Sequence, residues 1–165
     1  MLTFVIPTWN RAPQLRRSLC SIAERVSTRP VKVIVSDHGS TDETPQVIAE
    51  FAEKYPFVSG TRLERGDADD YATNFRHCFG LAATKWTWTF GDDDLLAGNA
   101  LDVIFDVLNR PEFDDEYQFV HVSEVSRSQN SGRLVKGKLI DLCNNIGWID
   151  MTGFITGNKI GRAHV

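Results

Sequence analysis

Four short segments typical of strands, each followed by a polar loop and a helical pattern, limit most strongly how this chain can fold. Residues 2–6 and 31–35 are apolar runs, residues 58–63 are a weaker strand pattern, and in 85–90 the residues Trp86, Trp88 and Phe90 alternate with polar ones. Short runs of this composition are typical of buried strands in a parallel sheet. Strands that alternate with helices are joined by right-handed crossovers. The sequence therefore predicts an α/β fold, with a Rossmann-like, mostly parallel twisted sheet and helices on both faces.

Helical patterns with one apolar face follow each run. Pro13 and Pro45 stand where two of these helices begin, a position at which proline is favoured. The last helix is expected to start near Leu96. Residues 119–125 and 133–136 predict two further strands, joined by a turn at 130–132. The expected apolar faces are Leu15, Leu19, Ile22 and Val26; Val47, Ile48 and Phe51; Ala72, Phe75, Cys78, Phe79 and Ala82; and Leu101, Ile104, Phe105 and Leu108.

The composition excludes some classes of protein. With a net charge of -4, the chain is a poor non-specific binder of nucleic acid, so no nucleic-acid partner is expected. Cys20, Cys78 and Cys143 are scattered, without a zinc-binding spacing, and predict reduced, mostly buried thiols. The apolar run at 2–6 is too short for a signal sequence or a membrane span. We therefore expect a cytoplasmic domain.

The segment 85–90 is followed by Gly91 and then by Asp92, Asp93 and Asp94. Adjacent carboxylates repel one another, and a divalent cation, which prefers oxygen ligands, would neutralise them. The alternative is an exposed acidic turn that caps the following helix. An acidic run alone favours that alternative, whereas the preceding apolar strand and the loops at 7–10 and 37–42 favour the cation. All three loops lie at carboxyl ends of strands, where ligands bind in such sheets.

The second loop begins with Asp37, which stands at the end of the second predicted strand. Its carboxylate is placed to accept the imide N–H of uracil or a ribose hydroxyl; alternatively, it is a turn residue bonded to its own backbone. Asp42 fits that structural role better. Gly39 is expected to supply a backbone shape that a side chain would block. We also expect one of two hydroxyl residues, Ser40 or Thr41, to cap the helix behind Pro45.

The first loop, 7–11, offers Thr8 to a base or ribose and Arg11 to phosphate or solvent. Trp9 is either a core or rim aromatic residue or a contact to the base, and the sequence does not decide between them. Asn74 and Arg76 stand in the helix before the acidic run. Arg76 would pair with the aspartates or a phosphate, or else form a surface salt bridge.

Three blocks of this chain resemble the family 2 glycosyltransferases of GT-A fold. They are residues 4–11, 35–44 and 89–94, in the order and approximate spacing of that family. The resemblance implies that Thr8 contacts the nucleoside, that Asp37 reads the base, and that 92–94 is the DxD region. The implied donor-binding residues are Pro7, Thr8, Asn10, Arg11, Asp37, Asn74, Arg76, Asp92 and Asp93, and the implied metal ligands are Asp92, Asp93 and Asp94.

The same resemblance implies an activity: transfer of a sugar from a nucleotide-diphosphate donor to a glycan or lipid-linked acceptor, with inversion and with Mn²⁺ or Mg²⁺. The expected pathway is the synthesis of cell-surface polysaccharide or glycoconjugate. Two positions depart from the family pattern. His38 stands where a second acid or Asn is usual, and Gly91 where D-x-D-D would place an acid. The working pair is therefore either Asp92 with Asp93 or Asp92 with Asp94.

No residue matches the family's catalytic base, which we expect beyond residue 165; Asp150 stands too early. The sequence thus predicts a truncated GT-A domain at 1–159, whose missing C-terminal part would allow peripheral membrane association. Residues 160–165 match the translation of a common sequencing adapter and are expected to be a non-native tail. One alternative is a non-catalytic nucleotide-binding module. A more remote one is a nucleotidyltransferase, but such enzymes usually carry a Gly-rich phosphate loop near the first strand, and residues 7–10 do not supply one.

Overall fold

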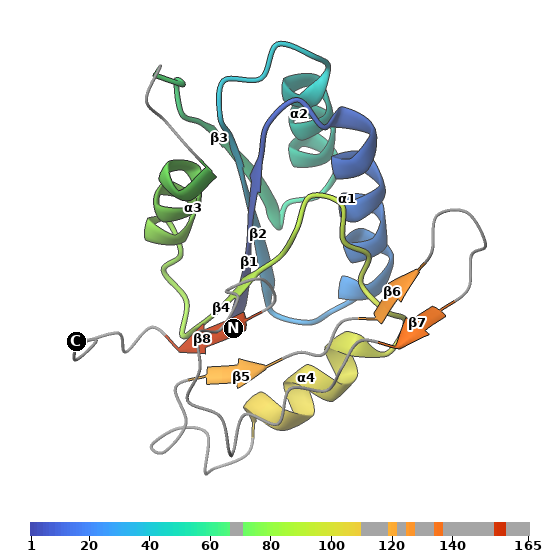
Figure 1. Cartoon of the computed structure of the whole chain (residues 1–165). Helices are drawn as coiled ribbons and strands as arrows, with labels where there is room; N and C mark the ends of the chain where they lie inside the picture. Colours follow the sequence, from blue (N-terminus) through green and yellow to red (C-terminus); the bar gives the residue numbers. More distant parts are fainter. Residues whose placement is uncertain (67–70, 110–118, 122–124, 128–133, 137–153, 158–165) are drawn as a thin grey trace.

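The computed structural model describes residues 1–66 and 71–109 and four short strands further along the chain. The strands β3, β2, β1, β4, β8 and β5 form one sheet in that order, and β6 pairs with β7 (Figure 1). The predicted α/β class is therefore confirmed. The strands are β1 (Leu2–Thr8), β2 (Val31–Asp37), β3 (Val58–Arg62), β4 (Trp86–Thr89), β5 (Phe119–His121), β6 (Val125–Arg127), β7 (Leu134–Lys136) and β8 (Phe154–Gly157).

The strand β1 lies at the centre of the parallel part of the sheet. It pairs with β2 over its full length, from Leu2 opposite Val31 to Thr8 opposite Asp37. On its other side it pairs with β4. All four parallel strands match the strand segments predicted from the sequence. The carboxyl ends of β1, β2 and β4 consequently lie next to one another.

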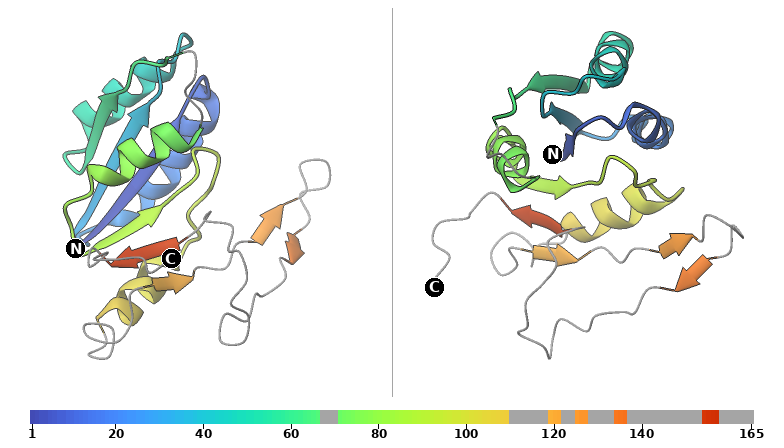
Figure 2. Two further views of the ribbon diagram at one scale, coloured as in Figure 1. Left: turned by 60° about the vertical axis from the view of Figure 1, so that its left-hand side comes forward. Right: turned by 45° about the horizontal axis from the view of Figure 1, so that its top comes forward.

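Helices cover both faces of this sheet, as the sequence predicts. The helices α1 and α2 lie on one face and α3 on the other (Figure 2). The helix α4 shares the hydrophobic core of α1 and α2 through Leu101, Ile104 and Leu108. No helix within the described residues is both long and apolar enough to cross a bilayer. The helices are α1 (Ala12–Val26), α2 (Thr44–Lys54), α3 (Tyr71–Gly80) and α4 (Ala100–Leu108).

The two faces of β1 are buried in different surroundings. Phe4 and its neighbours on one face join the aromatic side chains of β4 and the apolar faces of α1 and α4 in one core. On the other face, the Thr3 hydroxyl shares a 2.7 Å hydrogen bond with that of Thr84. Under α3, the Cys78 thiol donates to the carbonyl of Ile34. This second face is therefore joined by hydrogen bonds as well as by apolar contact.

Several expected boundaries are corrected. The first strand extends past the run at 2–6 and past Pro7, because β1 continues through Thr8. The helix expected near Leu96 begins at Ala100. Instead of one strand at 119–125 there are two, β5 and then β6, which begins at Val125, and β6 and β7 form the expected antiparallel pair. The turn at 130–132 lies outside the described residues.

One strand was not predicted. The four residues of β8 (Phe154–Gly157) insert between β4 and β5 and run antiparallel to both. Of the cysteines, Cys78 is buried as expected, whereas Cys20 is exposed on α1. Burial raises the pKa of the Cys78 thiol to about 12, so it stays protonated and unreactive. Cys143, Asp150 and the segment 160–165 lie outside the described residues.

Candidate functional site

Three loops meet where β1, β2 and β4 end. Thr8 lies opposite Asp37 in the register of β1 and β2. Its carbonyl accepts a hydrogen bond from the backbone N–H of His38 at 3.0 Å. Its hydroxyl donates to Oδ2 of Asp92 at 2.8 Å. Thr8 thus connects the Asp37 loop with the acidic turn at the carboxyl ends of the strands. This is the arrangement expected if the three loops form one ligand-binding crevice.

The acidic turn is held by the first loop. Asp92 is 5% exposed, and the Thr8 hydroxyl occupies one of its oxygens. Its other oxygen accepts a hydrogen bond from the Arg11 guanidinium at 3.0 Å. A second nitrogen of Arg11 donates to the half-exposed Asp93 at 3.1 Å. One arginine therefore bridges two carboxylates, which offsets their mutual repulsion.

Asp94 folds back on the start of the same turn. Its Oδ2 accepts a hydrogen bond from the backbone N–H of Gly91 at 3.0 Å. A Cβ atom added at Gly91 would lie 2.6 Å from that oxygen. A side chain at Gly91, which departs from the family pattern, would therefore displace the Asp94 carboxylate from its present position. Of the three acids, Asp93 alone is left with an exposed carboxylate and no bond to its own turn.

Burial changes the acidity of this turn. It raises the pKa of Asp92, although the hydrogen bond from Thr8 and the charge of Arg11 act against it. It also raises the pKa of Asp94, with the backbone N–H of Gly91 opposing and the charge of Asp93 adding to the effect. Neutralisation of these two carboxylates, by a proton or by a cation, is therefore favoured by their surroundings.

A pH dependence of stability follows. Because both pKa values lie above 3.8 in the folded chain, the folded state binds more protons there than the unfolded state. The free energy of unfolding then falls as pH rises through the raised values. Asp42, whose pKa is lowered, acts in the opposite sense, but below 3.8. In the double variant Asp92→Asn with Asp94→Asn, we expect the free energy of unfolding to fall less steeply as pH rises.

Urea unfolding in metal-free buffer, between about pH 4 and about pH 7, measures this dependence. Other titrating groups contribute equally to the wild type and the double variant, so the difference between the two curves is the quantity of interest. Curves that run parallel across this range would show that the two carboxylates keep their ordinary acidity.

Asp37 is already engaged by its own loop. It is 2% exposed, and its Oδ1 accepts a hydrogen bond from the backbone N–H of Ser40 at 3.0 Å. Gly39 makes this turn with a φ of +67°, a conformation that glycine adopts freely, as the sequence predicts. The other oxygen of Asp37 accepts from Arg62 at 2.7 Å. Asp37 is therefore a turn residue bonded to the backbone of its own loop, the alternative role considered for it. A contact with a ligand would be additional.

Asn10 joins the first loop to the second. Its side-chain oxygen accepts from the backbone N–H of Thr41 at 2.7 Å, and its own N–H donates to the Ser40 hydroxyl at 2.8 Å. Its φ of 52° is rare outside glycine but tolerated by asparagine. These contacts give Asn10 a scaffolding role within the described residues. The Ser40 hydroxyl faces Asn10, so the expected cap on α2 is wrong for that residue.

The helix termini beside this site are served by Asp42. Its Oδ1 accepts from the backbone N–H of Thr44 at 2.9 Å, the structural role predicted for it. Its Oδ2 accepts from the N–H of Ala12 at 3.2 Å, at the start of α1. Thr41 makes no side-chain cap on α2 either, because its hydroxyl donates to Asn10. One carboxylate thus fixes the first turns of α1 and α2 relative to each other.

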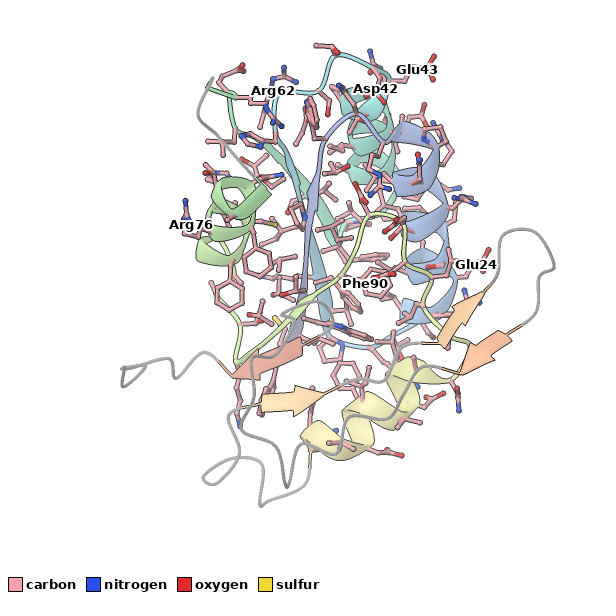
Figure 3. All side chains as sticks on the ribbon, viewed as in Figure 1. Glu24, Asp42, Glu43, Arg62, Arg76 and Phe90 are labelled. Carbon is pink, nitrogen blue, oxygen red and sulfur yellow. The ribbon has the colours of Figure 1, made fainter. Side chains whose placement is uncertain are left out.

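Asn74 and Arg76 have different surroundings. Asn74 is 3% exposed and donates to the carbonyls of Thr8 and Ser36, at 3.3 Å and 3.0 Å. It holds the ends of β1 and β2 together from the α3 side. Arg76 is exposed, donates to Thr73, and points away from the sheet (Figure 3). The expected pairing of Arg76 with the aspartates is wrong, since the arginine that reaches them is Arg11.

Sequence reasoning missed two arginines at this site. Arg62 lies opposite Asp37 in the register of β2 and β3, and Figure 3 shows it at the same end of the molecule as Asp42. Arg65 places its guanidinium 3.9 Å from the ring centre of Trp9, which is 46% exposed. Trp9 is therefore a rim residue and not part of the core. The two arginines of segment 62–65 could have indicated a positively charged wall of the site. Only the sheet order shows that this segment faces Asp37.

The described residues supply oxygen donors suited to Mn²⁺ or Mg²⁺. No group of three His, Cys, Asp or Glu side chains within them is arranged to hold an ion. Asp92 and Asp93 offer two carboxylates, however, and hard cations commonly complete their coordination with phosphate oxygens and water. The chemistry of the site thus fits such a cation, provided that the Arg11 guanidinium leaves the two carboxylates.

This geometry defines a class of protein. In the order β3-β2-β1-β4, the chain reverses its direction of winding between β1 and β4, and open α/β sheets bind ligands at such a point. The sequence model of "Glycosyl transferase family 2" matches residues 3–164. The chain belongs to this family, so the predicted family is confirmed.

Relatives of known name agree with the family. The chain is 30% identical, over 105 residues, to "Abequosyltransferase RfbV" of Salmonella typhimurium, covering 63% of this chain and 31% of the relative. Among solved structures, it is similar to the Pyrobaculum calidifontis mannosyltransferase PcManGT in complex with GDP-Man and Mn²⁺, with a TM-score of 0.60, 26% identity, and coverage of 74% and 35%. The fold of S. aureus TarS 1–349 also matches, with a TM-score of 0.66, 18% identity, and coverage of 82% and 38%. The chain thus spans about a third of the length of these proteins.

Proposed function

We propose that this chain binds the nucleotide-diphosphate part of a sugar donor for a glycosyltransferase reaction. The observation that supports this most directly is the position of Thr8, which connects Asp37 to Asp92 across the ends of three strands. A nucleoside beside Asp37 and a diphosphate beside Asp92 would then lie in one crevice. Family membership and the GDP-Man bound by the mannosyltransferase support the same assignment.

In this proposal, each part of the site has a distinct task. Thr8 and Asp37 hold the nucleoside, with the fixed turn at Gly39 shaping the wall next to it. Asp92 and Asp93 hold Mn²⁺ or Mg²⁺, which when bound neutralises the charge of the departing nucleotide diphosphate. The cation preference is supported by the oxygen donors of the turn and by the Mn²⁺ in the mannosyltransferase. Inversion, and a glycan or lipid-linked acceptor, remain predictions.

Thermal unfolding of the chain with nucleoside diphosphates tests this proposal. We expect UDP, GDP or CDP to raise the unfolding temperature only when Mn²⁺ is present. The expected rise is several degrees at a ligand concentration of about 100 times the dissociation constant, because ligand binding to the folded state adds about 2.7 kcal/mol there. Asp93→Ala with Asp94→Ala should abolish the rise, since it removes Asp93, one of the two proposed cation ligands, and the Asp94 carboxylate that accepts from Gly91 and shapes the turn.

A charge-matched control separates this effect from a general loss of negative charge. Glu53→Ala with Asp106→Ala removes two exposed carboxylates from α2 and α4. This variant should keep the full response to nucleotide and Mn²⁺. Stabilisation by nucleotide that needs no metal and survives Asp93→Ala with Asp94→Ala would contradict the proposal.

A further inference from the structure

The Arg11 guanidinium stands where a cation would have to bind. Its two terminal nitrogens contact different residues, one bonding to Asp92 and the other to Asp93. The second oxygen of Asp92 is turned toward the Thr8 hydroxyl. The arginine therefore occupies one oxygen of each carboxylate, Oδ1 of Asp92 and Oδ2 of Asp93.

The backbone of Arg11 is fixed while its side chain is open to solvent. Its N–H donates to the hydroxyl of Thr44 at 3.1 Å, and its carbonyl accepts from Leu15 at 2.9 Å. The side chain is 44% exposed, and its two ion pairs are with the acidic turn. The guanidinium can consequently leave the carboxylates by side-chain rotation alone, without a change in α1.

Departure of Arg11 would leave Asp92 in place. The 2.8 Å hydrogen bond from Thr8 does not involve the oxygen that Arg11 contacts, so it keeps this carboxylate oriented. Without the guanidinium, two adjacent negative charges would face each other with one side buried, an arrangement that favours binding of a small cation. The turn is thus pre-formed in both states, and what changes is its counter-ion.

We propose that Arg11 is an internal counter-ion of Asp92 and Asp93 that a divalent cation must displace. The proposal rests on the proposed function, because it concerns the same acidic turn. It makes Arg11 a positioning residue that keeps the two carboxylates together before the donor arrives. It also makes the affinity of the free chain for a cation weaker than the acids alone would give.

Binding of Mn²⁺ alone to the 165-residue chain tests this, measured by the loss of the free-ion electron paramagnetic resonance signal. We expect Arg11→Gln to bind Mn²⁺ about tenfold more tightly than the wild type, a change of about 1.4 kcal/mol. Arg16→Gln is the matched control. It removes the same charge from α1, the helix that follows Arg11, but its partner is Glu50, so it should leave Mn²⁺ affinity nearly unchanged.

A second readout detects a merely structural role. Without metal, Arg11→Gln should unfold at a lower temperature, because Asp92 and Asp93 lose their counter-ion, and Mn²⁺ should restore the loss. Arg11→Lys should bind Mn²⁺ with an affinity between those of the wild type and Arg11→Gln. The lysine ammonium is a compact point charge, so it cannot bridge both carboxylates as the arginine fork does. This variant keeps the charge, so it answers the question even where Arg11→Gln does not fold.

Equal or weaker Mn²⁺ binding by Arg11→Gln, or no binding by either protein, would overturn the proposal. That outcome is distinct from failure of the proposed function. A wild type that is stabilised by a nucleoside diphosphate with Mn²⁺, while Arg11→Gln gains no affinity for the ion, would retain the donor site and reject the counter-ion role.

Discussion

Phe4→Ala is expected to lower the free energy of unfolding by about 3–5 kcal/mol, the usual cost of removing a fully buried phenylalanine. Phe4 lies on the central strand β1 and is 0% exposed. Its ring stacks on Trp88 at 4.9 Å between centroids and meets Phe90 edge-on at 5.4 Å. The cavity would open in the core on the face of β1, and Trp88 and Phe90, which also contact each other, would each lose one aromatic partner.

Urea unfolding followed by tryptophan fluorescence measures this loss, since Trp88 borders the cavity. Val103→Ala is the control. It also shortens an apolar side chain, but at an exposed position of α4, and should change stability by less than about 0.5 kcal/mol. A loss below about 1 kcal/mol for Phe4→Ala would show that the aromatic cluster does not behave as a packed core.

The four parallel strands and the helices between them could be predicted from the sequence, because β1, β2 and β4 bury most of their residues and the helices bury a periodic face, while the weaker pattern of β3 buries only Val58. In β1, all seven residues are buried, so its apolar composition follows from its position. The helix α4 was predicted from Leu101, Ile104 and Leu108, which face the core as expected. Local pattern determines structure well where one element faces one core.

Local pattern is less reliable where a loop or a distant partner makes the decision. Leu96 is buried, but it is a loop residue whose N–H donates to the Ser21 hydroxyl of α1. Its burial explains its apolar side chain, which in the sequence pattern looks like the first residue of a helix. The strand β8 has no strong pattern of its own. It forms by pairing with β4 and β5, and β4 lies more than sixty residues away in sequence.

The candidate site shows the same division. The residue types at Thr8, Asp37 and Asp92 follow from where each strand ends, and these residues do meet. Their arginine partners could not be predicted in the same way. Arg62 reaches Asp37 because the register of β2 and β3 sets the two opposite each other, and Arg11 reaches Asp92 because β1 is adjacent to β4. Both depend on sheet order.

Asn74→Ala is expected to lower the free energy of unfolding by about 2–4 kcal/mol, because two buried carbonyls each lose a hydrogen bond from the Asn74 amide. It also removes the 2.6 Å hydrogen bond from the Ser36 hydroxyl. Urea unfolding measures the loss, and Asn109→Ala, at an exposed asparagine, should change stability by less than about 0.5 kcal/mol. Stability like that of Asn109→Ala, with nucleotide-dependent stabilisation lost, would make Asn74 a ligand contact instead of the connection between β1 and β2.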